Sequence, residues 1–235
     1  MVYDLALPRH SYALPLIDEA LSRGLTVVEL QPPEAYDALV EGRVRAALIP
    51  LALARGAKIC PGPMVWSLSA TMSVAIYSFS VRRLDDCAAV AVSGESRTSL
   101  VYLREVREKL QAPWSIVQAE RGCVTLECLL SRADCALLLG DEALRARTRL
   151  PPIEDLGRLV KRVLGISPVY AVTASIEDCP SGLPRGEPAV RRRHIEELCR
   201  RTGLGLRDAL MYYTVLNLSY SPEHLENALH VFDRE

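Results

Sequence analysis

The stretch VSGESRTSLVYL (92–103) places small and hydroxylated residues directly before an apolar helical pattern. Ser96 stands at the expected helix start, and Arg97, Thr98 and Ser99 form its first turn. Backbone N–H groups at a helix start lack partners within the helix, and the helix dipole favours negative charge there. Two interpretations follow. Either Ser96 only caps the helix, which contributes about 1 kcal/mol, or the turn binds a ligand carboxylate.

A second turn of the same kind is LLLGDEAL (137–144), in which Gly140 and Asp141 follow an apolar strand pattern and begin a helix. Open α/β folds bind ligands at such turns, beyond the carboxyl ends of their strands. The alternative is that Asp141 is an ordinary helix cap. We expect Gly140 and Asp141 to contribute to a ligand site.

The turn LPRHSYALP (7–15) also joins a strand to a helix and offers His10, Ser11 and Tyr12. His10 is the only histidine near a candidate site, and its ordinary pKa suits a general base. The alternative for a lone histidine is a surface or capping position. We therefore predict His10 and Tyr12 as catalytic residues and Ser11 as a binding residue.

The segment WSLSATMS (66–73) alternates hydroxyl side chains along an extended pattern, including Ser67 and Ser69. Such alternation is also typical of the solvent-facing side of a strand. We add Ser67 and Ser69 to the predicted binding residues.

Composition excludes several other classes of function. The net charge is −1 over 235 residues, which does not suggest a nucleic-acid surface. The N-terminal segment has no secretory pattern and no apolar run reaches membrane length, so we expect a cytoplasmic location without a membrane partner. Seven cysteines form no CxxC pair, so we expect no metal site and no cofactor. One disulfide is compatible with a heat-adapted source, and scarce amides are consistent with such a source.

Apolar β-rich runs alternate with helical patterns along most of the chain, which predicts an α/β fold. Strands are expected near 2–7, 25–30, 44–50, 72–80, 88–92, 114–118, 135–140 and 167–175, and helices near 12–23, 32–41, 97–110, 122–132, from 141, 154–164, 187–202, 206–218 and from 222. We predict two lobes: residues 1–81 with 168–235, including a helical tail, and an inserted lobe at 82–167. The strands near 74–80 and 168–174 would cross between them, with a ligand cleft between the lobes.

Seven segments in order resemble one family, the menaquinone-pathway enzymes that comprise chorismate dehydratase and dihydroxynaphthoate synthase. SRTSLVYL (96–103) matches the S-R-T-S helix start of that family best. HSYALPLIDEAL (10–21), GRVRAALIPLALA (42–54), SLSATMSVAIYS (67–78), LLLGDEAL (137–144), IEDLGRLVKRVLGISPVYAVTA (153–174) and the tail YYTVLNLSYSPEHLENALHVF (212–232) are similar to its other motifs.

The resemblance implies a two-lobed fold like that of type II periplasmic solute-binding proteins. It also implies a hydro-lyase that dehydrates chorismate to 3-(1-carboxyvinyloxy)benzoate in menaquinone biosynthesis, without a cofactor. Ser96, Arg97, Thr98 and Ser99 would bind a carboxylate. Gly140 with Asp141 would line the opposite wall, and Ser67 with Ser69 the hinge side.

Five residues depart from the family pattern. Tyr12 replaces an asparagine, Leu51 a serine, Arg45 an aspartate, and Ala70-Thr71 a Gly-Pro pair. The alternatives are therefore a related enzyme that acts on another carboxylate, and a non-catalytic protein that binds or senses a small carboxylate. The sequence leaves the oligomeric state open.

Overall fold

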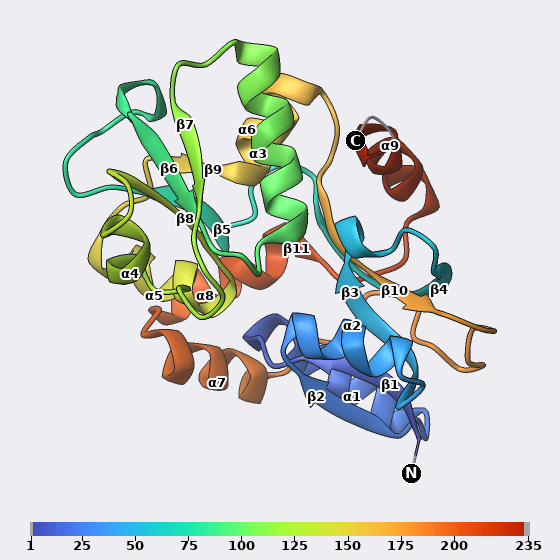
Figure 1. The fold of residues 1–235 in the computed structure, drawn as a ribbon. Coiled ribbons are helices and arrows are strands. Elements are labelled where there is room, and N and C mark those ends of the chain that lie inside the picture. The colour runs from blue at the N-terminus through green and yellow to red at the C-terminus, as the bar shows by residue number, and fades with distance from the viewer. Residues whose placement is uncertain (1, 233–235) are drawn as a thin grey trace.

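The computed structural model describes residues 2–232 and contains two β-sheets with helices packed around them (Figure 1). The predicted α/β class is confirmed. The ends of the predicted first lobe, residues 1 and 233–235, lie outside the described residues. No helix among residues 2–232 is long and apolar enough to cross a membrane.

The first sheet has the strand order β11-β4-β10-β3-β1-β2. Its strands are β1 (Tyr3–Pro8), β2 (Val27–Leu30), β3 (Val44–Pro50), β4 (Lys58–Ser67), β10 (Val169–Ser175) and β11 (Leu216–Asn217). Strands β1, β2 and β3 run parallel, whereas β10 is antiparallel to both β3 and β4. The carboxyl ends of β1 and β3 therefore lie at the same edge, where the turn that contains His10 begins.

The second sheet has the order β7-β6-β8-β5-β9. Its strands are β5 (Val74–Tyr77), β6 (Ala89–Val92), β7 (Ser115–Gln118), β8 (Cys135–Leu139) and β9 (Glu154–Asp155). Strands β6, β7 and β8 run parallel, so the turns after β6 and β8 lie at one edge. Those are the turns that contain Ser96 and Gly140.

The helices mostly follow the predicted pattern. They are α1 (Leu14–Ser22), α2 (Pro32–Val40), α3 (Arg97–Leu110), α4 (Leu126–Leu130), α5 (Gly140–Arg149), α6 (Leu156–Leu164), α7 (Arg192–Thr202), α8 (Leu206–Val215) and α9 (Pro222–Phe232), with short 3-10 helices at Ser11–Ala13, Leu51–Leu53 and Leu84–Asp86. On α3, Leu100, Leu103 and Val106 are buried, but Leu110 is exposed at the last turn. Figure 1 shows α3 between the second sheet and the strand β10.

The passages between the two sheets differ from the expectation. Strand β5 pairs with β8 and β9 inside the second sheet, and β10 pairs only within the first. The chain therefore passes between the sheets in the loops 68–73 and 165–168, not along those strands. Strand β5 makes its backbone hydrogen bonds within the second sheet. The boundary between the lobes therefore lies before β5 and not, as expected from the sequence, after residue 81.

The loop 68–73, called the hinge loop below, is held by one carboxylate. Asp155 accepts hydrogen bonds from the backbone N–H of Thr71 at 3.1 Å and of Met72 at 2.9 Å. It also caps α6 by accepting from the Arg158 N–H at 3.1 Å. A side chain at Gly157 would place its Cβ 2.1 Å from the Ser69 carbonyl oxygen, so only glycine fits there.

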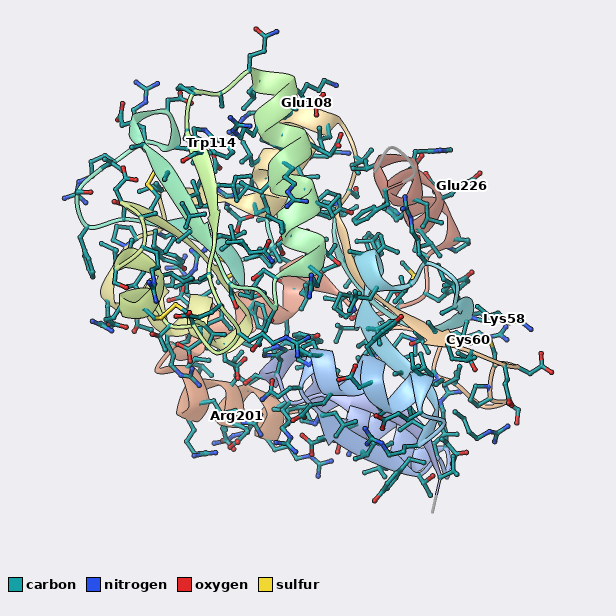
Figure 2. All side chains as sticks on the ribbon, viewed as in Figure 1. Lys58, Cys60, Glu108, Trp114, Arg201 and Glu226 are labelled. Atoms are coloured by element: carbon teal, nitrogen blue, oxygen red, sulfur yellow. A yellow bond between two sulfur atoms is a disulfide. The ribbon has the colours of Figure 1, made fainter. Side chains whose placement is uncertain are left out.

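Three disulfides link the described residues: Cys60–Cys179, Cys87–Cys135 and Cys123–Cys128. The expectation of one possible disulfide was therefore too low, and Cys199 is the free cysteine among the described residues. Figure 2 shows Cys60 on β4 near Lys58. The first disulfide ties this strand to the loop before α7.

Candidate functional site

A cavity lies between the two sheets and is lined by residues from both. It has a volume of about 660 Å³ with its open mouth included. Among the predicted site residues, the following line it: His10, Tyr12, Ser96, Arg97, Thr98, Ser99 and Gly140. The structure thus brings together three turns that are far apart in the sequence.

The start of α3 forms one wall of the cavity. Ser96 occupies the N-cap position, but its side chain makes no capping hydrogen bond. Its Oγ is buried without any partner in the described chain, and the residue is 2% exposed. The interpretation of Ser96 as a plain helix cap therefore fails. A buried hydroxyl without a partner costs free energy, which a ligand oxygen at this position would recover.

Arg97 and Thr98, which follow Ser96, add positive charge and a hydrogen-bond donor to this wall. Arg97 is exposed at the cavity and has no ion-pair partner within residues 2–232. Thr98 already uses its Oγ1 as an acceptor for the Ala52 N–H at 3.2 Å, which links the two lobes. Its hydroxyl proton remains to be donated. With the dipole of a 14-residue helix, this wall favours an anion.

His10 and Tyr12 form the opposite wall. Their rings stack with centroids 5.6 Å apart. Burial lowers the pKa of His10 from its usual value, although the nearby Asp141 and Glu95 carboxylates act in the other direction. The imidazole is therefore neutral at neutral pH and can accept a proton. Burial raises the pKa of Tyr12, so its phenol stays protonated and acts as a donor.

Gly140 lies against His10. Its φ is +57°, and a Cβ there would come within 2.7 Å of the His10 Nδ1. Glycine is thus required both by the backbone conformation and by the imidazole packed on it. The Gly140 N–H donates to the Ser73 carbonyl at 2.7 Å, which ties α5 to the hinge loop.

Asp141 and Ser11 bind each other across the cleft. Asp141 accepts from the Ser11 N–H at 3.1 Å and from the Ser11 Oγ at 2.8 Å, and both residues are buried. Tyr213 donates to the Ser11 carbonyl at 2.8 Å. Neither Ser11 nor Asp141 lines the main cavity. Together they form an interlobe latch, and Asp141 faces an adjacent outer cavity of about 810 Å³.

Ser67 and Ser69 also lie outside the cavity. Ser67 is fully buried and donates to the Ser69 carbonyl at 3.0 Å, so the pair shapes the hinge loop. Two hydroxyls of the same segment, those of Thr71 and Ser73, belong to residues that line the cavity instead. Thr71 Oγ1 lies 2.9 Å from the Tyr170 hydroxyl.

Sequence reasoning missed Glu95 and Tyr170, which both line the cavity. Burial holds the pKa of Tyr170 well above its usual value, so it too is a donor. In the sequence, Tyr170 could have been noticed as a hydroxyl side chain inside the apolar strand pattern VYAVTAS. Glu95 could have been noticed as a charged residue within a turn of small residues.

Solved structures resemble this fold over nearly the whole chain. Protein AF1704 from Archaeoglobus fulgidus is 14% identical, with a TM-score of 0.67 over 99% of this chain and 95% of that one. The periplasmic aliphatic sulphonate binding protein SsuA from Escherichia coli is 11% identical, with a TM-score of 0.66 over 99% and 86%. No curated protein matches the sequence significantly. The chain therefore has the two-lobed type II fold of periplasmic solute-binding proteins.

The family model described as menaquinone biosynthesis matches residues 10–226. The chain therefore belongs to the menaquinone biosynthesis family. This confirms the family resemblance and supports a role in making menaquinone.

Proposed function

We propose that the chain is a chorismate dehydratase-like lyase that forms 3-(1-carboxyvinyloxy)benzoate. The observation that carries the proposal is the buried Ser96 hydroxyl, which has no partner within residues 2–232, at the uncapped start of α3 in a cleft with a neutral His10. A carboxylate fits that wall, and the ring attached to it would occupy the cavity that His10 and Tyr12 also line.

The reaction removes one ring proton and one hydroxide from chorismate, so a base and a donor suffice. His10 takes the proton from the ring carbon, and the electron pair moves into the ring as the hydroxide departs. Tyr12 donates a hydrogen bond to the leaving oxygen, because its raised pKa keeps it protonated. The imidazolium then returns its proton to the hydroxide, and water leaves. Aromatisation of the ring makes the step favourable.

Ser96, Arg97 and Ser99 bind the carboxylate in this proposal, and Thr98 adds its hydroxyl proton. The latch of Asp141 and Ser11 holds the lobes closed and excludes water, so these two act on the cleft and not on the ligand directly.

A cytoplasmic location in a heat-adapted organism is part of the proposal, and intracellular disulfides are frequent in such organisms.

A second candidate is a non-catalytic protein that binds or senses a small carboxylate, or an enzyme for another carboxylate. Tyr12 favours it, since the resembling family has an asparagine there. Leu51 is buried in a 3-10 helix and lines no part of the main cavity, so its replacement of a serine bears less on the choice.

The test is incubation of the purified chain with chorismate at moderate and high temperature, followed by chromatography and mass measurement. The proposal expects 3-(1-carboxyvinyloxy)benzoate with the folded wild-type chain and a large loss with His10→Ala. Intact chorismate after incubation with a folded, chorismate-binding chain would favour the binding protein instead.

A further inference from the structure

Glu95 is an acidic side chain in the cleft whose carboxylate is unpaired among the described residues. It lies in the turn between β6 and α3 and lines both the main and the outer cavity. Its N–H donates to the Ser93 Oγ at 3.3 Å, but its carboxylate makes no hydrogen bond or ion pair within residues 2–232. Glu95 is half-buried directly before the N-cap of α3, and its carboxylate is available to a partner that carries positive charge.

His10 is the group that it faces. His10 comes from the first lobe, lines the same two cavities, and interacts electrostatically with Glu95. The other groups around the imidazole are already engaged. Asp141 binds Ser11, and Arg145 donates to Glu142 and to the Arg201 carbonyl.

The remaining charges around His10 act in opposite directions. Arg145 on α5 and Arg201 on α7 disfavour the imidazolium, while Asp141 on α5 favours it. Tyr12 stacks on the ring as a neutral phenol. Glu95 is thus the acidic group that faces His10 and is bound to nothing else in the described chain.

We propose that Glu95 is a positioning residue for His10, which faces it across the cleft and stabilises the imidazolium formed when His10 takes a proton. The inference rests on the proposed function for the role of His10 as the base. The ring C–H bond breaks, an N–H bond forms on the imidazole, and the positive charge appears opposite the Glu95 carboxylate. The same proton then leaves with the hydroxide as water.

The two partners come from different lobes, so the pair exists only when the lobes are closed. An open cleft leaves His10 without Glu95 and exposes it to water. Closure therefore makes the base stronger at the moment at which the ligand is enclosed.

The experiment is an NMR titration of His10 in the full chain. Four histidines are present, and His10→Gln identifies the resonance. Glu95→Gln removes the facing charge, so the imidazolium is less favoured and the pKa of His10 falls. The matched control is Glu120→Gln, which removes one charge from the same lobe where Glu120 pairs with Arg132 on the surface. In that control the pKa of His10 stays at the wild-type value.

Equal His10 titrations in Glu95→Gln and Glu120→Gln, with both variants folded, overturn the inference whatever the activity. If chorismate is turned over, Glu95→Gln lowers kcat about tenfold, leaves KM within about twofold, and moves the acid limb of the kcat profile to lower pH. Glu95→Asp restores part of the rate. Absence of turnover in the wild type counts against the proposed function only, because the titration still decides the pairing.

Discussion

His10 packs so closely on Gly140 that this helix start has no room for a side chain. We expect Gly140→Ala to lower the free energy of unfolding by about 2–3 kcal/mol, of which about 1 kcal/mol is the positive φ. Denaturant unfolding measures the effect. Gly24→Ala is the matched control, because Gly24 has φ +79° and nothing within 4 Å of its Cβ, so it should lose only about 1 kcal/mol.

The same contact can be tested from its other side. In a His10→Ala background the clash disappears, and Gly140→Ala should then cost no more than Gly24→Ala. An undiminished cost in that background would contradict the packing of His10 on Gly140.

The latch between Asp141 and Ser11 is the most direct polar link across the cleft. Asp141→Asn keeps one acceptor oxygen but replaces the other, which accepts from Ser11, by an N–H₂ group. We therefore expect the closed form to become about 1–3 kcal/mol less stable relative to the open form. Small-angle scattering should show a larger radius of gyration, and a bound carboxylate should dissociate faster. Asp208→Asn, an exposed change on α8, serves as the control. Unchanged scattering and dissociation would show that the latch does not hold the lobes.

Single residues also show the limits of sequence reasoning about the site. Ser96 could be found because a hydroxyl at a helix start is a local signal. The partnership of Asp141 with Ser11 could not, because 130 residues separate them and no local pattern joins them. Glu95 was passed over because an acidic residue in a turn is usually solvated, and only the folded chain shows the cavity on both sides of it.

At the level of elements, Asp155 combines two tasks that usually belong to different residues. It caps α6 and binds the hinge loop, so Asp155→Asn should lower the free energy of unfolding by about 2–4 kcal/mol. Thr125→Ala removes an ordinary cap, since Thr125 accepts only from the Cys128 N–H, and should cost about 1 kcal/mol. If denaturant unfolding gave the same loss of unfolding free energy for Asp155→Asn and Thr125→Ala, the contacts of Asp155 to the hinge loop would contribute nothing.

The strand β4 shows why part of the fold escaped prediction. Its sequence KICPGPMVWS contains Pro61, Gly62 and Pro63, which are unfavourable in a central strand. The structure nevertheless places it between β10 and β11, with shifts in the β10 register that accommodate the prolines. Elements with a clear period, such as α3 and β8, were predicted because burial on one face decides them locally.

Across the whole molecule, the disulfides close loops of very different length. Cys60–Cys179 spans 119 residues, whereas Cys123–Cys128 spans 5. From loop-closure entropy, replacing the first pair by alanines should cost about 5 kcal/mol and the second about 2 kcal/mol. Denaturant unfolding without reductant measures both. A larger loss from the short loop would contradict the entropic account.

The central claim for the molecule is that its lobes close on a carboxylate held at the start of α3. Calorimetry with 3-(1-carboxyvinyloxy)benzoate tests it most directly, because this stable aromatic dicarboxylate needs no turnover. We predict that Ser96→Ala with Ser99→Ala weakens binding by about 2–3 kcal/mol, roughly 30- to 150-fold, at about 1–1.5 kcal/mol per charge-assisted hydrogen bond. Ser131→Ala, at the exposed end of α4, should bind like the wild type. Equal affinity of the double variant and the wild type would contradict the assignment of the site.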